Sequence, residues 1–177
     1  KFGTIFYSEA EYHHEGLTGL MFEGGKPTWR HGYPPMNYPT HCTSYLVGVT
    51  RERLVQATCV GWGDEHEILK DNVYKNPFWS ESAFFKTDQG HAMRVCVFWH
   101  VASGGCERGA WYGDKLSLHD PTPGGQPYVV GYGMPKIRME RTQMPNFYDR
   151  LPEPLRHPSG HEGSHTFLTH EFVDAVV

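Results

Sequence analysis

A single histidine follows a proline-rich stretch in the sequence PPMNYPTHCTS, residues 34–44. Three prolines within six residues restrict the backbone, and residues 40–50 then read as a short helix. His41 would lie in the first helical turn, where the positive end of the helix dipole disfavours a charged imidazolium. Because a neutral ring held in one place can accept a proton, His41 is the first candidate for acid–base chemistry. The alternative is a half-buried histidine that hydrogen-bonds to a loop carbonyl.

Two polar residues flank this histidine. Tyr38 carries a hydroxyl and Asn37 an amide, and either group can hydrogen-bond to a hydroxyl of a bound substrate. Both residues also have structural uses, because Asn37 or Thr40 can cap the following helix and Tyr38 can pack against the core. Taken alone, each is better explained by capping or packing. Beside a functional His41, they become candidate substrate contacts.

A second group of titratable residues lies near the N-terminus. In the segment GTIFYSEAEYH, residues 3–13, alternation puts Glu9, Glu11 and His13 on one face of a predicted strand. These side chains could line a polar substrate pocket, or bind a metal together with histidines from elsewhere in the chain. The sequence holds twelve histidines, so chance clusters are expected. A solvated strand edge is therefore favoured over a metal site.

Two candidates lie outside these segments. His165 opens the predicted C-terminal helix, residues 165–177, on the side of its apolar residues, which is typical of a histidine at the edge of a core. With His161 it would be the nearest partner for a metal. Arg30 lies in the loop that leads to His41 and could hold an anionic or hydroxylated group, although loop arginines are usually solvated.

The composition and the missing motifs exclude several classes of function. A formal net charge of −4 argues against nucleic acid or an anionic membrane as a partner, because both favour basic patches. No apolar run approaches the roughly 20 residues of a membrane helix, and no signal peptide is visible. Four widely spaced cysteines indicate reduced thiols in a cytoplasmic protein. The sequence has no P-loop, GxSxG, HExxH or strand–GxGxxG–helix motif, so no cofactor is expected to bind to this chain.

The order of the elements predicts an α+β fold. Helices are expected at residues 40–50 and 165–177, the second capped by Ser164, and strands at residues 3–13, 53–62, 80–87, 91–101 and, as a hairpin, 106–120. Residues 121–135 are rich in proline and glycine and show no regular pattern. Adjacent strands favour an open, mostly antiparallel sheet with helices on one face. The 177 residues are expected to form one domain, and the strand-like start and helix-like end indicate a piece of a longer protein.

Several segments together resemble the C-terminal half of the Gfo/Idh/MocA oxidoreductases, the relatives of glucose-fructose oxidoreductase and inositol dehydrogenase. They are GTIFYSEAEYHH, TWRHGYPPMNYPTHCTSYL, WYGDKLSL and GSHTFLTHEFVDAV, in this order, and YPTH is the most specific element. The resemblance covers nearly the whole chain. It implies a dihydrodipicolinate-reductase-like C-terminal domain that packs beside an N-terminal Rossmann domain, absent from this chain, and often forms a homodimer through its sheet face.

The resemblance also implies a chemistry. Family members commonly carry an Asp and a His four positions apart, and here Asn37 takes the position of the Asp and His41 that of the His. In family terms, His41 exchanges a proton with a hydroxyl while hydride moves to or from NAD or NADP. Asn37 cannot ionise and would only hydrogen-bond the substrate. The nucleotide-binding glycines and the catalytic lysine belong to the N-terminal domain, so this chain alone is expected to be inactive.

The expected function is the substrate-binding and dimerisation domain of an NAD(P)-dependent oxidoreductase acting on a sugar, polyol or glycoside. With His41 as acid/base, the expected substrate contacts are Asn37, Tyr38, Arg30, Glu11, His13 and His165. Two alternatives stay open. The YPTH form also resembles the NAD-dependent glycosidase branch, in which oxidation at one carbon enables elimination at the next. A non-catalytic sugar-binding or scaffolding relative would agree with the presence of Asn37.

Overall fold

The computed structural model describes residues 2–14, 18–63, 66–102, 106–121, 125–140, 147–157, 159–160 and 163–177. They fall into two compact units, Lys1–Arg141 and Thr142–Val177. No helix among the described residues combines the length and the apolar character needed to span a membrane.

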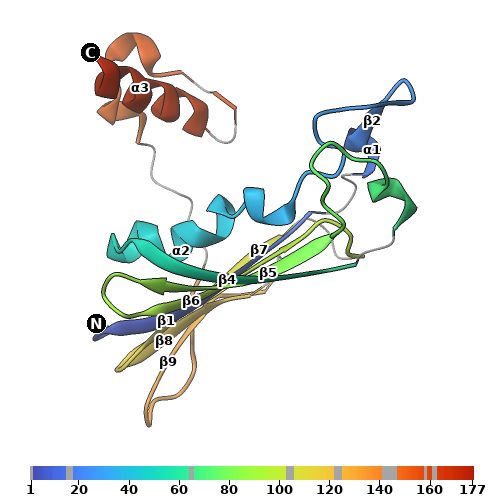
Figure 1. Ribbon diagram of the computed structural model, residues 1–177. Helices are drawn as coiled ribbons and strands as arrows, with labels where there is room; N and C mark the ends of the chain where they lie inside the picture. The colour runs from blue at the N-terminus through green and yellow to red at the C-terminus, as the bar shows by residue number, and fades with distance from the viewer. Residues whose placement is uncertain are drawn as a thin grey trace. The chain divides into compact units, whose positions relative to one another are not determined.

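An eight-stranded sheet dominates the first unit (Figure 1). Its strands are β1 Ile5–His13, β4 Leu54–Trp62, β5 Ser80–Thr87, β6 Ala92–Phe98, β7 Cys106–Gly113, β8 Leu116–Asp120, β9 Tyr128–Gly131 and β10 Ile137–Arg138. Their order in the sheet is β10-β9-β8-β7-β1-β6-β5-β4. The central strands β1 and β6 are parallel, and the other neighbouring pairs are antiparallel. The predicted α+β fold with a large, mostly antiparallel sheet is confirmed.

The short elements of the first unit lie between these strands. They are α1 Thr18–Met21, β2 Phe22–Glu23, β3 Lys26–Pro27, the 3₁₀ turns η1 Pro35–Asn37 and η2 Glu67–Leu69, and α2 Thr40–Thr50. α2 packs against β1, β6 and β7 and runs along one face of the sheet (Figure 1). In the described part of this unit, the opposite face of the sheet carries no packed helix. We call this opposite face the open face.

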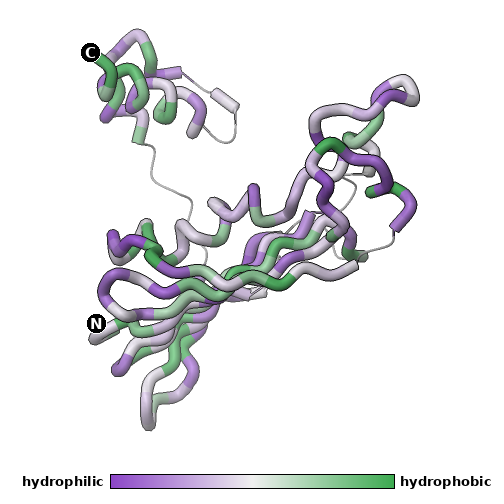
Figure 2. The backbone as a smooth tube through the Cα atoms, viewed as in Figure 1, coloured by the Kyte–Doolittle hydropathy of each residue, from purple (hydrophilic) through white to green (hydrophobic). Residues whose placement is uncertain are grey.

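The core lies between α2 and the sheet. Every second residue of the central strands faces α2, and residues one turn apart in α2 face the sheet. Ala10 and Tyr12 of β1 are buried on the α2 side, and Val95 lies beside Ala10 in β6. Cys42 and Leu46, one turn apart in α2, are buried against them. Figure 2 shows hydrophobic and hydrophilic segments following one another along the strands. The predicted faces of the first strand are thus confirmed.

A glycine lets α2 approach β7 closely. A Cβ atom on Gly109 would lie 2.4 Å from ring atoms of Tyr45 and 2.8 Å from the backbone oxygen of Glu9. The space that Gly109 leaves is filled by the Tyr45 ring, which stacks on Trp111 with ring centroids 4.8 Å apart. Trp111 also donates a hydrogen bond from Nε1 to the backbone oxygen of Tyr45. These contacts hold the middle of α2 on the sheet.

The predicted helix caps are wrong. α2 begins after Pro39, and neither Asn37 nor Thr40 caps it, because the backbone of Thr40 is already helical. The Pro39 carbonyl instead accepts hydrogen bonds from the amides of Cys42 and Thr43, at 2.9 and 2.8 Å. The C-terminal helix starts after a glycine in the left-handed region, and Ser164 is already inside it.

The end of the sheet differs from expectation as well. Residues 121–135 showed no strand pattern, yet β9 lies within them and β10 follows directly. β9 pairs with β8, and the backbone of β8 supplies hydrogen-bond partners for the four residues of β9. Pairing with an existing strand compensates for the weak local signal, since β-structure depends strongly on its neighbours.

The second unit consists of η3 Tyr148–Arg150, η4 Glu153–Leu155 and α3 Ser164–Val176. Leu151 is buried in it, and the Arg156 side chain donates hydrogen bonds to the backbone oxygens of Leu151 and Asp149.

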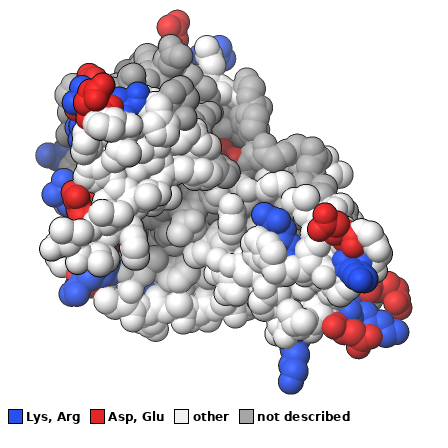
Figure 3. Space-filling view, turned by 90° about the horizontal axis from the view of Figure 1, so that it is seen from above, with Lys and Arg blue, Asp and Glu red and all other residues white. Residues whose placement is uncertain are grey.

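In the view of Figure 3, charged side chains of both signs lie in small mixed groups on the surface. No extended basic patch lies on the part of this face that the structure describes.

Candidate functional site

The proline-rich turn before α2 is held by contacts from the sheet. Glu81 of β5 accepts a hydrogen bond from the backbone amide of Met36, at 2.5 Å. The Trp99 indole donates to the backbone oxygen of Tyr33, at 3.1 Å, just before the prolines. The amides of Asn37 and Tyr38 close the η1 turn onto the prolines, at 3.0 and 2.9 Å. These hydrogen bonds hold the backbone at the start of α2 in place, as the proline-rich sequence predicted.

His41 lies in a cluster of aromatic rings at this point. Its ring stacks on Tyr12 of β1, with centroids 4.4 Å apart and planes 11° apart, and on Tyr38, with centroids 5.0 Å apart. Trp99 meets both tyrosines edge-on. Burial, and then the neighbouring Tyr38 and Glu107, raise the pKa of Tyr12 to about 12. Tyr12 therefore stays a neutral phenol near pH 7, and the imidazole rings that meet the cluster are those of His41 and, edge-on, His14.

A carboxylate from β7 completes the surroundings of His41. Nδ1 of His41 lies 2.5 Å from Oε1 of Glu107. An ionised carboxylate can only accept, so Nδ1 donates this bond, and Nε2 of the neutral ring is then left as the acceptor. Among the residues that the structure describes, Nε2 has no hydrogen-bond partner. His41 is about one-quarter exposed, so a ligand can reach it.

Two further candidates lie on the chain just before this cluster. Asn37 is exposed at the end of η1, and its backbone oxygen accepts a hydrogen bond from the Tyr33 hydroxyl, at 3.1 Å. Arg30 is exposed and places its guanidinium over the Trp29 ring, 4.3 Å from the centroid, and Trp29 meets Tyr33 edge-on. Within the described residues Arg30 has no ion pair. The structure thus links Arg30 and Asn37 through Trp29 and Tyr33.

The structure does not bring Glu11 and His13 to this site. Both lie on the open face, because they alternate in β1 with Tyr12, which faces α2. Glu11 is buried among its partners: Arg108 at 2.5 Å, with Arg94 and His13 each at 3.2 Å. Glu11 and His13 are therefore members of a network of charged side chains on the sheet, and these contacts explain the burial of Glu11.

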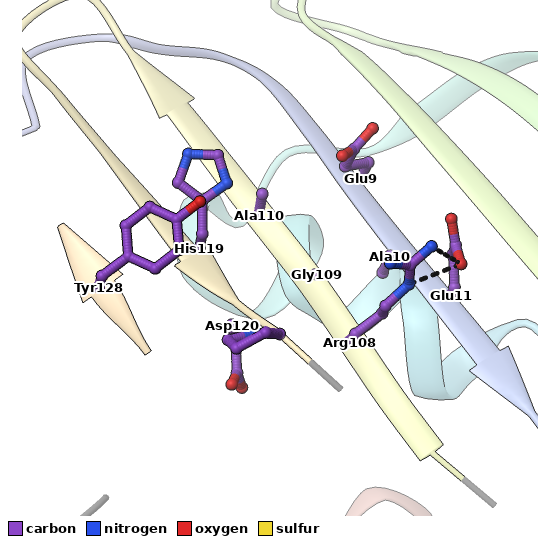
Figure 4. A pocket seen from close by; sticks show the side chains of 10 residues that line it. Glu9, Ala10, Glu11, Arg108, Gly109, Ala110, His119, Asp120 and Tyr128 are labelled. Atoms are coloured by element: carbon purple, nitrogen blue, oxygen red, sulfur yellow. Dashed lines mark hydrogen bonds and ion pairs between the residues drawn. The ribbon is translucent and has the colours of Figure 1, made fainter. Parts of the chain in front are cut away.

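A small cavity adjoins this network on the sheet (Figure 4). It has a volume of about 190 Å³ and is lined by Glu9, Glu11, Arg108, His119 and Tyr128, among others. His119 stacks on Tyr128, and partial burial lowers the pKa of His119. Glu9, Glu11 and Arg108 line it from the open face, away from the His41 cluster, while Asp120 lines it from β8.

His165 lies in the second unit, at the start of α3. It lines a cavity of about 530 Å³ together with His157 and His170, and His170 forms an ion pair with Asp174 at 3.3 Å. His161, its suggested metal partner, lies outside the described residues. Among the described residues, no group of three or more His, Cys, Asp or Glu side chains is arranged to hold a metal.

Glu107 was missed in the sequence. It precedes an arginine in a predicted strand and has no neighbour in the sequence that marks it as functional. Its place near His41 follows from the register of β1 and β7, which puts it beside Tyr12. Only the antiparallel pairing of two strands about 95 residues apart brings it to His41, and no local pattern reports such a pairing.

The cysteines give a direct test of the packing under α2. The thiols of Cys42, Cys59 and Cys96 are free. Burial raises the pKa of Cys42 to about 12, whereas Cys59 is exposed on β4. Because the thiolate is the reactive form, we expect iodoacetamide to modify Cys42 at least about 100-fold more slowly than Cys59 in the folded protein. Peptide mass spectrometry measures both rates, and equal rates would show that Cys42 is not buried between α2 and the sheet.

No protein-family model and no curated protein matches the sequence. Solved structures do match it. UDP-N-acetylglucosamine 3-dehydrogenase GnnA from Acidithiobacillus ferrooxidans has a TM-score of 0.54 at 10% identity, over 81% of this chain and 41% of that chain. An inositol dehydrogenase homologue from Azotobacter vinelandii, in complex with NADH and myo-inositol, has a TM-score of 0.58 at 16% identity, over 79% and 36%. An oxidoreductase from Sinorhizobium meliloti has a TM-score of 0.57 at 15% identity, over 95% and 45%.

The chain spans less than half the length of these structures. At such low identities the likeness is one of fold. The chain therefore shares its fold with a part of each of these oxidoreductases.

Proposed function

We propose that this chain is the substrate-binding domain of an NAD(P)-dependent oxidoreductase that acts on a hydroxyl of a sugar or polyol. The observation that carries the proposal is the His41 cluster. The ring is held by two tyrosines and a carboxylate, and Nε2 is left to accept a proton. A fixed acceptor at hydrogen-bond distance from a substrate hydroxyl is what general-base catalysis requires.

Oxidation of an alcohol removes a proton from the oxygen and a hydride from the carbon. We assign the first task to Nε2 of His41, and the second requires a nicotinamide, which accepts hydride. The sequence has no strand–GxGxxG–helix segment, so its residues do not fit a dinucleotide site. That cofactor would have to be held by residues outside these 177.

The substrate class rests on the site and on the fold neighbours. Tyr38 and the exposed Asn37 present a hydroxyl and an amide beside His41, groups that suit a polyhydroxylated ligand. Two of the fold neighbours are described as acting on or binding such compounds, a UDP-N-acetylglucosamine 3-dehydrogenase and an inositol dehydrogenase homologue with myo-inositol. The other expected substrate contacts have weaker support: Arg30 is linked to this cluster through Trp29 and Tyr33, Glu11 and His13 lie on the open face, and His165 belongs to the second unit.

A screen of the full-length protein tests the proposal. Sugars, polyols and glycosides are each mixed with NAD or NADP, and reduction of the nicotinamide is followed by its absorbance. We expect reduction with at least one polyhydroxylated compound and none with simple alcohols. If a glycoside is cleaved without net reduction of the cofactor, the glycosidase alternative is correct. Sugar binding without either reaction would identify a non-catalytic relative.

We also propose that two copies of the chain associate through the open face. Val60 and Phe84 are more than half exposed there, and Glu9 and Arg94 form an ion pair at 3.0 Å in the same row of the sheet. A two-fold interface needs one patch that complements itself, and a face with apolar groups and charges of both signs can do so.

Light scattering after gel filtration tests this interface. We expect a mass of twice 20.2 kDa for the chain. Replacing Phe84 by Asp should raise the dissociation constant of the dimer by about 10-fold or more, since losing a buried aromatic contact typically costs over ~1 kcal/mol. The matched control is Val49→Asp on α2, which is also exposed but lies on the other side of the sheet. A Phe84→Asp dimer as tight as the wild type would exclude this interface.

A further inference from the structure

Glu107 lies at a position in the sheet from which its carboxylate reaches His41. It lies near the start of β7, and the register with β1 makes Glu107 the direct neighbour of Tyr12. Tyr12 stacks on the His41 ring, so the Glu107 side chain on the same face points to the edge of that ring. The resulting distance between Nδ1 and Oε1 is 2.5 Å.

The carboxylate of Glu107 is committed to this contact. The neighbouring Arg108 points to the other side of the sheet, where it pairs with Glu11 at 2.5 Å. Among the described residues, no Lys or Arg forms an ion pair with Glu107. Its partner within that part of the chain is the His41 ring, whose protonated form it can neutralise.

Asn37 cannot take this role. Its amide does not ionise, and among the described residues its side chain forms no hydrogen bond. The backbone of Asn37 is used in η1, and the side chain is exposed to solvent. The negative charge beside the histidine thus comes from the sheet, and Asn37 is left free to contact a ligand.

We propose that Glu107 is the positioning residue of the acid/base His41, an inference that rests on the proposed function. By accepting the Nδ1 proton, Glu107 fixes the tautomer in which Nε2 is unprotonated. When Nε2 takes the proton of the substrate hydroxyl, the ring becomes an imidazolium and the substrate oxygen an alkoxide. Glu107 keeps its hydrogen bond and stabilises the new positive charge. In the reverse direction, Nε2 returns the proton to the alkoxide that hydride addition creates.

The tautomer of His41 can be read directly by NMR. Long-range ¹H–¹⁵N correlations distinguish protonated from unprotonated ring nitrogens, and the 177-residue chain is small enough for this measurement. At a pH where the ring is neutral, we expect the proton of wild-type His41 on Nδ1. In Glu107→Ala, the Nε2-protonated tautomer should become the major form. Glu107→Gln keeps an acceptor of the same shape and should shift the balance only in part.

Two controls make the spectrum decisive. His91 forms a similar pair with Glu52, at 2.7 Å, so its signals should not change in the Glu107 variants. Glu67→Gln removes an exposed carboxylate elsewhere and should leave His41 as in the wild type. The same spectra report whether each variant is folded. An unchanged His41 tautomer in folded Glu107→Ala would overturn the proposal.

Kinetics of the full-length protein give the second readout. Glu107→Ala should lower kcat by about 10–10³-fold with little change in KM, less than the loss of the base itself. Glu107→Asp should recover part of that loss. If the tautomer changes but kcat does not, Glu107 orients the ring without contributing to catalysis, and the proposal is overturned. If the wild type has no activity, the proposed function fails while the tautomer result still stands.

Discussion

Replacing His41 by Ala in the full-length protein is expected to lower kcat for sugar or polyol oxidation by about 10²–10⁴-fold, the usual contribution of a general base. The change removes Nε2, to which we assign the proton of the substrate hydroxyl. It leaves the aromatic walls of the site, Tyr12 and Tyr38, in place. KM should change less than kcat, because the base acts mainly in the transition state.

His100→Ala is the matched control for this variant. Like His41, His100 stacks on an aromatic ring, that of Trp79, but it is exposed and has no carboxylate partner among the described residues. We expect His100→Ala to keep the wild-type kcat within about two-fold. A folded His41→Ala protein with the activity of His100→Ala would show that His41 is a structural histidine, as the simpler reading of the sequence allows.

Replacing Leu46 by Ala is expected to have the largest effect on stability. Leu46 is fully buried between α2 and the sheet, so the change removes apolar contacts and leaves a cavity. Such changes cost about 2–5 kcal/mol of the free energy of unfolding. Urea unfolding followed by tryptophan fluorescence measures this cost in the first unit alone, because all five tryptophans lie in it.

Val49→Ala is the control for Leu46. It removes apolar atoms from the same helix, but Val49 is 56% exposed, so we expect a cost below about 1 kcal/mol. Since α2 carries His41 in its first turn, a loosened helix should also weaken the cluster. Equal costs for both variants would mean that Leu46 is not buried between α2 and the sheet.

Local patterns were sufficient to predict much of the fold. The alternation in residues 3–13 identified β1 and its two faces, and the prolines located the start of α2 correctly. The strand pairs β5–β6 and β7–β8 follow from apolar alternation around short turns. β9 was missed because its four residues carry little signal, and it is formed by pairing with β8.

The candidate site could be predicted only in part. His41, Tyr38 and Asn37 are neighbours in the sequence, and the structure keeps them together at one turn. Glu11 and His13 were grouped with them by type, yet the pleat of β1 sends them to the open face. Glu107 could not be found, because its place beside His41 depends on the register of two strands far apart in the sequence.

Chemical rescue tests the central claim, that His41 exchanges a proton with the substrate, most directly. The measurement is the rate of nicotinamide reduction by full-length His41→Ala with increasing concentrations of imidazole. We predict that imidazole restores part of the lost rate and that more basic imidazoles restore more, while the His100→Ala protein does not respond. A folded His41→Ala protein whose rate is the same with every imidazole would contradict the assignment.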